Sequence, residues 1–73
     1  MKFKEIPEEA KIKFIQTVVM SANLLQKNVT MDDATAWLNN NAEFTTLEKM
    51  DGSIDVRFTT NTRNKYNKWL QSL

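Results

Sequence analysis

The chain has no histidine and no cysteine, and it has one glycine and one proline in 73 residues. Without histidine it has no imidazole to act as a base near neutral pH. Without cysteine it can form no disulfide, and it has neither a thiol nucleophile nor the usual ligands of a structural zinc ion. A single glycine excludes a glycine-rich phosphate loop. These absences predict a protein that is not an enzyme and that uses no metal and no cofactor.

The acidic residues do not form a recognisable catalytic or metal-binding group either. Glu8 with Glu9 and Asp32 with Asp33 form two adjacent pairs at predicted helix starts, where the helix dipole favours the charged carboxylate. They are interpreted as helix-capping residues. Residues 51–55 read Asp-Gly-Ser-Ile-Asp, but they lack the spacing of acids and the final glutamate of a calcium loop. We therefore interpret this segment as a turn.

The composition predicts one folded domain over residues 1–73. The apolar fraction is 41%, with two Trp, four Phe and one Tyr, at a size close to the lower limit for a single core. No apolar run approaches the about 20 residues of a membrane helix. The first residues are charged, which is not the pattern of a signal peptide. We expect a cytoplasmic protein with no membrane partner.

The net charge is only +1, but the charge is distributed unevenly. Residues 1–27 carry a balance of +2, residues 28–55 carry −5, and residues 56–73 carry +4. The four basic residues of the last segment are Arg57, Arg63, Lys65 and Lys68. They would give the fold a basic face for an anionic partner. Alternatively, they neutralise the acidic middle of the chain within the fold.

Three segments have helical signals. The first helix is predicted over about 7–27, because proline fits the first helical position. Its core face repeats with the helical period and comprises Phe14, Ile15, Val18, Val19, Ala22 and Leu25. A capping box of Thr30 and Asp33 begins a second helix over about 31–40. Its inward residues are Ala34, Trp37 and Leu38, and Asn39–Asn41 end it, because asparagine tolerates the left-handed conformation.

Residues 43–60 alternate between apolar and polar side chains as a β-hairpin does, with Asp51-Gly52 at the turn. A two-residue turn would pair Leu47 with Val56. A three-residue turn, with Gly52 in the left-handed conformation, pairs Phe44 with Phe58 and Thr46 with Val56 instead. We favour the second register because it buries both phenylalanines on one face, although it leaves Leu47 outside.

A third helix is predicted over about 61–73. Its apolar stripe consists of Tyr66, Trp69, Leu70 and Leu73, and we expect it to cover Phe58 and Val56. The element order is therefore α-α-β-β-α. This order places the protein in the α+β class, with a two-stranded antiparallel hairpin packed against helices.

Two apolar residues do not fit the core face of the first helix. Met20 and Leu24 are spaced i and i+4 and point nearly opposite that face, among polar neighbours. Either the third helix or residues 1–6 cover them, or they contact a partner or a second copy of the chain. The free edge of the hairpin offers a further route, by strand addition. The acidic start of the second helix could also mimic an anionic ligand.

We predict a non-enzymatic interaction protein that binds another protein, with a homodimer as a further option. The predicted contact residues are Met20, Leu24, Arg57, Arg63, Lys65 and Lys68. The abundant Asn, Thr, Lys and Ile indicate an A+T-rich coding sequence. By analogy, small proteins of this kind are accessory regulators or inhibitors of host factors from phages or mobile elements.

The alternative is nucleic-acid binding. The basic C-terminal face of Arg57, Arg63, Lys65 and Lys68 could bind a nucleic-acid backbone. In addition, two helices followed by a hairpin resemble, in element order alone, a winged helix-turn-helix domain, and this resemblance implies that the second helix reads the nucleic acid. However, it begins with Asp32 and Asp33, and residues 28–48 contain no Arg or Lys, so phosphate groups would be repelled there. Protein binding is the favoured interpretation.

Overall fold

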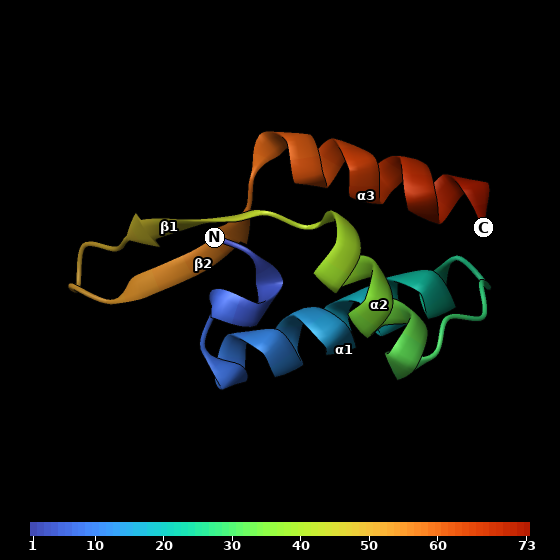
Figure 1. The fold of residues 1–73 in the computed structure, drawn as a ribbon, viewed down its shortest axis with the longest axis horizontal. Coiled ribbons are helices and arrows are strands. Elements are labelled where there is room, and N and C mark those ends of the chain that lie inside the picture. Colours follow the sequence, from blue (N-terminus) through green and yellow to red (C-terminus); the bar gives the residue numbers. More distant parts are fainter.

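Three α-helices, one short 3-10 helix (η1) and one β-hairpin make up the computed structural model, which describes residues 1–73. The elements in chain order are η1 (Phe3–Glu5), α1 (Glu8–Leu24), α2 (Met31–Asn41), β1 (Phe44–Glu48), β2 (Ile54–Phe58) and α3 (Thr60–Ser72). The strands form a two-stranded antiparallel sheet. The hairpin projects to one side, and the three helices gather at its other end (Figure 1). The predicted α+β class and element order are confirmed.

The N-terminal segment contributes to the core. Phe3 and Ile6 are buried, which the sequence pattern did not reveal. Met1 and Phe44 exchange two backbone hydrogen bonds, of 2.8 and 2.9 Å, so the segment adds a short bridge to the outer edge of β1. The segment therefore does not cover Met20 and Leu24, which are 64% and 85% exposed. The option that residues 1–6 or the third helix cover this pair is wrong.

The first helix ends three residues earlier than predicted. Gln26 has a φ of 58°, and its N–H donates to the carbonyl of Asn23 at 2.9 Å, while the N–H of Lys27 donates to Ala22 at 2.8 Å. This pair of bonds is a Schellman motif, which ends a helix in the left-handed conformation. Leu25 was predicted to lie in the core, but it is 52% exposed because the helix stops before it.

The second helix begins as predicted and ends differently. Thr30 and Asp33 form the capping box, with hydrogen bonds of 3.1 and 3.2 Å. The three predicted inward residues, Ala34, Trp37 and Leu38, are all buried. The prediction that a left-handed asparagine ends the helix is wrong. No asparagine has a positive φ, and the chain leaves the helix through an extended Ala42 instead.

The hairpin has the favoured register. Phe44 pairs with Phe58 and Thr46 pairs with Val56. Gly52 has a φ of 86°, and its N–H donates to the carbonyl of Lys49 at 3.0 Å. This geometry is the three-residue turn with a left-handed glycine.

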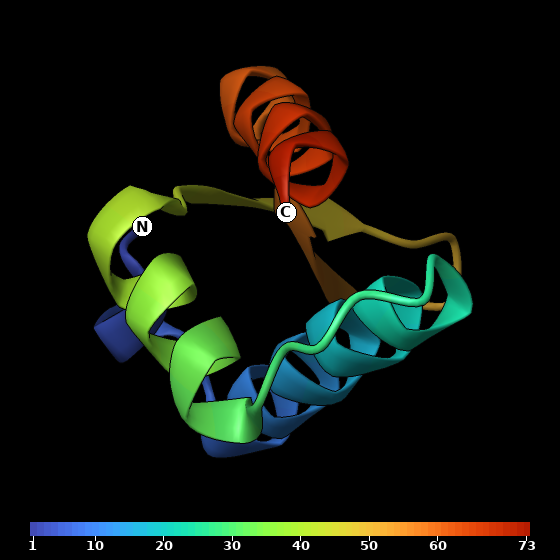
Figure 2. The ribbon, with the colours of Figure 1, turned by 90° about the vertical axis from the view of Figure 1, so that its right-hand side faces the viewer.

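The third helix lies above α1 and α2 in the view of Figure 2. Its apolar stripe reaches the sheet through Tyr66, whose ring centre is 5.4 Å from that of Phe58. Trp69 does not cover the sheet. It stacks on Trp37 of α2, with ring centres 5.1 Å apart and an interplanar angle of 20°. Val56 lines a groove beside α1 instead. The predicted contact of the stripe is therefore correct for Tyr66 and wrong for Trp69.

Candidate interaction surfaces

Met20 and Leu24, which we call the α1 patch, lie one turn apart on the exposed side of α1. Residues spaced by four on a helix are surface neighbours. Lys13 and Thr17 continue the same line of side chains toward the start of the helix, because the steps of four, three and four keep to one face. The four residues form a ridge that is apolar at one end and basic at the other.

Arg57 does not belong to a free basic face. Its Nε donates a hydrogen bond to Oδ2 of Asp55 at 2.9 Å. This bond lowers the pKa of Asp55 below its ordinary value, and the charges of Lys49 and Lys13 act in the same direction. The two residues thus neutralise each other on the exposed face of β2.

The other three predicted basic residues, Arg63, Lys65 and Lys68, lie on α3, and all three are exposed. None makes an ion pair, and the helix has no acidic residue. Lys65 and Lys68 share one side of the helix, whereas Arg63 precedes Lys65 by two residues and points away from it.

The six sequence-predicted contact residues therefore do not form one site. The α1 patch lies on α1, Arg57 lies on the hairpin, and the remaining three lie on α3. Helices α1 and α3 occupy opposite sides of the molecule in both views (Figures 1 and 2).

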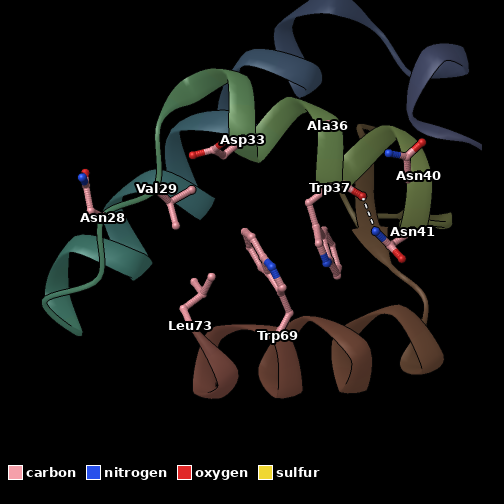
Figure 3. Close-up of a pocket in the computed structure, with 9 residues that line it drawn as sticks. All are labelled: Asn28, Val29, Asp33, Ala36, Trp37, Asn40, Asn41, Trp69 and Leu73. Carbon is pink, nitrogen blue, oxygen red and sulfur yellow. Dashed lines mark hydrogen bonds between the residues drawn. The ribbon is translucent and has the colours of Figure 1, made fainter.

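A groove between α2 and α3 was not predicted. It has a volume of about 400 Å³ and is lined by Asn28, Val29, Asp33, Ala36, Trp37, Asn40, Asn41, Trp69 and Leu73. Trp69 stands between Trp37 and Leu73, and Val29 and Asp33 face it from the other wall (Figure 3). No basic side chain lines the groove. The sequence pattern assigned both tryptophans to the core, so it did not predict that they line a groove together. The polar asparagines that follow Trp37 were the one feature of the sequence that indicated an open surface there.

A second groove separates α1 from β2. Its volume is about 320 Å³, and its walls are Pro7, Glu9, Ala10, Lys13, Phe14 and Thr17 on one side and Ile54, Asp55 and Val56 on the other. Two residues of the α1 ridge, Lys13 and Thr17, thus face β2 across this groove.

No group of three or more acidic side chains is placed to hold a metal ion. No helix combines the length and the apolar character that crossing a bilayer requires. Donors at the surface lower the pKa of Glu43, through Lys2, and of Asp51, through Ser53. A carboxyl group that acts as a general acid at neutral pH needs a pKa raised above its ordinary value instead.

Comparison with known proteins gives no relative from which a function can be carried over. No family model matches the chain, and no curated protein and no solved structure matches it.

Proposed function

We propose that the chain is a non-enzymatic protein that acts by binding another protein, and that the α1 patch is the contact. The observation that carries this proposal is the exposure of Met20 and Leu24, at 64% and 85%, on a helix whose other face is core. Burying a side chain of this size against a partner is worth about 1.5–3 kcal/mol. A pair spaced i and i+4 is the pattern with which a helix occupies an apolar groove.

The ridge on α1 also describes the partner. Met20 and Leu24 require an apolar groove, and Lys13, two turns earlier, favours an acidic residue at one end of it. A domain that acts through such a contact works as a regulator or inhibitor, by occupying a surface that its partner needs. This role agrees with a small cytoplasmic accessory protein of the phage or mobile-element kind.

Site-specific photo-cross-linking tests the proposal. A photoreactive amino acid replaces Leu24 in one variant and Asn64, which is exposed on α3, in the control. Each variant is expressed in the cells from which the chain comes. We expect one discrete protein adduct through position 24, none through position 64, and loss of the adduct when Met20→Ser is added.

A second variant separates binding from folding. Because both side chains are exposed, Met20→Ser/Leu24→Ser is expected to change the free energy of unfolding by no more than about 0.5 kcal/mol. Equal adducts at positions 24 and 64, or a double variant that no longer folds, would show that the α1 patch is not a binding surface.

Binding to a nucleic-acid backbone is the second candidate. It is favoured by Arg63, Lys65 and Lys68, which are exposed on a helix without acids and make no ion pair. A mobility-shift titration with duplex and single-stranded DNA at two salt concentrations tests it. A complex that weakens with salt and is lost in Lys65→Glu/Lys68→Glu would support this candidate over protein binding.

A further inference from the structure

The hydrogen bonds at both ends of the hairpin fix which backbone groups of β2 point outward. Thr59 donates to the carbonyl of Glu43 at 3.1 Å, and Lys49 donates to the carbonyl of Ser53 at 2.8 Å. In an antiparallel pair, every second pair of opposed residues exchanges hydrogen bonds. Between these two ends, the bonded residues of β2 are therefore the odd-numbered ones.

The backbone groups of Ile54, Val56 and Phe58 consequently point away from β1. No hydrogen bond from elsewhere in the chain reaches them. They form an open edge of three N–H and three C=O groups, and the groove between α1 and β2 lies beside its first half. No hydrogen bond within the chain occupies this edge, and a groove separates its first half from α1.

The two edges of the sheet differ in their hydrogen bonding to the rest of the chain. On the outer edge of β1, Phe44 exchanges both of its outward hydrogen bonds with Met1, and Lys2 forms a bridge to Glu43, whereas the outward groups of Thr46 and Glu48 are not bonded. The edge of β2 has no such cover. It also has no proline and no bulge, which are common devices that keep an edge strand from pairing.

The sequence of β2 is complementary to itself in one register. If two copies pair antiparallel with Val56 opposite Val56, Ile54 lies opposite Phe58, and all outward groups of both strands are bonded. In the same register Asp55 lies opposite Arg57 of the other copy, twice, on the exposed face. Opposite charges at such positions stabilise a strand pair.

The neighbouring registers are unfavourable. A shift by two residues in one direction places Asp55 opposite Asp55, and a shift in the other direction places Arg57 opposite Arg57. Like charges directly opposite each other destabilise a strand pair. A shift by one residue would align outward groups with inward groups and lose the hydrogen bonds. Charge and hydrogen bonding therefore select the same arrangement.

We propose that the chain forms a twofold dimer in which the β2 edges of two copies pair with Val56 at the axis. The product is a four-stranded antiparallel sheet with β1 of each copy at its outer edges. The same surface is used by both copies, as a twofold interface requires. The α1 patch takes no part in the strand pairing, so this dimer does not depend on the function proposed above.

Charge exchange tests both the dimer and its register. In Asp55→Arg, and likewise in Arg57→Asp, the two cross-strand pairs become like-charged. We expect each variant alone to dimerise at least about tenfold more weakly than the unmodified protein in sedimentation equilibrium. A mixture of the two variants places Arg opposite Asp at both positions, so it is expected to form a heterodimer. The double variant Asp55→Arg/Arg57→Asp should dimerise like the unmodified protein.

Matched controls carry the same change in net charge away from the edge. Glu48→Arg on β1 controls for Asp55→Arg, and Arg63→Asp on α3 controls for Arg57→Asp. Both controls are expected to dimerise normally. Circular dichroism checks that every variant is folded. The double variant has the same two substitutions as the single variants. If it dimerises normally, weaker dimerisation of the single variants cannot be attributed to unfolding caused by either substitution.

Three results would overturn the proposal. The first is an unmodified protein that remains monomeric at every concentration. The second is a dimer that the single variants form as well as their controls do. The third is a dimer that survives Asp55→Arg but is lost in Met20→Ser/Leu24→Ser. This last result would move the contact to the α1 patch, whereas the cross-linking through position 24 tests the proposed function separately.

Discussion

The hydroxyl oxygen of Thr62 accepts a hydrogen bond from the backbone N–H of Glu43 at 2.9 Å, which joins the first turn of α3 to the start of β1. Thr62 is 2% exposed and is the only buried polar residue. Thr59 adds a second link, because its N–H donates to the carbonyl of Glu43 and its hydroxyl caps α3. These bonds set where α3 leaves the sheet, and the stacked tryptophans hold its far half.

Replacement of Thr62 by valine tests this link. Thr62→Val keeps the shape of the side chain but leaves the N–H of Glu43 without an acceptor, so we expect the free energy of unfolding to fall by about 1–3 kcal/mol. Thr62→Ser should lose less, because the hydroxyl remains. Thr60→Val is the control, since Thr60 is exposed on the same turn. Equal midpoints of denaturant unfolding for Thr62→Val and Thr60→Val would contradict the role of the hydroxyl.

The parts of the fold that could be predicted from the sequence are those that neighbouring residues decide. The capping box of Thr30 and Asp33 is a local motif, and it fixed the start of α2. Gly52 and the alternation around it were enough to select the hairpin register. In each case the interacting groups are a few residues apart, so the pattern contains both partners.

The parts that were missed depend on contacts between distant segments. Phe3 belongs to the core because its ring meets that of Phe44, 6.1 Å away across 41 positions of sequence. Helical periodicity placed Trp69 on an inward face but could not tell that Trp37 would be its neighbour. The open groove between α2 and α3 follows from that contact, so it could not be predicted either.

The candidate contact residues also divide into features that the local sequence indicates and features that only the folded chain defines. The position of Met20 and Leu24 opposite the core face followed from the helical period of α1, whereas their exposure was one of two options that the sequence left open. The ion pair of Arg57 with Asp55 joins two residues on the same face of β2. The alternation of the strand places both on that face, although Arg57 was assigned to a partner contact. The self-complementary register of β2 required the outward direction of its backbone groups, which only the paired hairpin defines.

Gln26 holds the left-handed position of the Schellman motif at the end of α1, with a φ of 58°. Any side chain with a Cβ is strained there by about 1–2 kcal/mol. Gln26→Gly is therefore expected to raise the free energy of unfolding by about 1 kcal/mol. Gly52→Ala, at the other position with positive φ, should lower it by a similar amount, although no atom lies within 4 Å of the added Cβ.

Helix propensity provides the control for these glycine variants. Asn23→Gly, three residues earlier and inside the helix, should not raise stability, because glycine there only loosens the helix. Thermal and denaturant unfolding of the three variants gives the comparison. Stabilisation by Asn23→Gly as well, or none by Gln26→Gly, would mean that backbone strain at position 26 does not limit stability.

The pair of Lys2 and Glu43 makes stability depend on pH. Nζ of Lys2 lies 2.8 Å from Oε1 of Glu43, and this hydrogen bond, with the charge of Lys2, holds the pKa of Glu43 below its ordinary value of 4.5. A carboxyl whose pKa is lowered by folding contributes stability above its unfolded pKa and loses it as the pH falls through the folded value. The contribution of the pair is thus expected at neutral pH and absent in strong acid.

Lys2→Met removes the donor and keeps much of the side chain's length. We expect this variant to be less stable than the unmodified protein at neutral pH, by a difference that shrinks with added salt because both side chains are exposed. The difference should vanish as the pH falls below the folded pKa of Glu43, and the NMR titration midpoint of the Glu43 carboxyl should rise in the variant. Lys4→Met, which removes a lysine without an ion pair, should show neither effect. A difference that persists in strong acid would assign the loss to packing of the lysine chain, because a protonated Glu43 has no charge to offer Lys2.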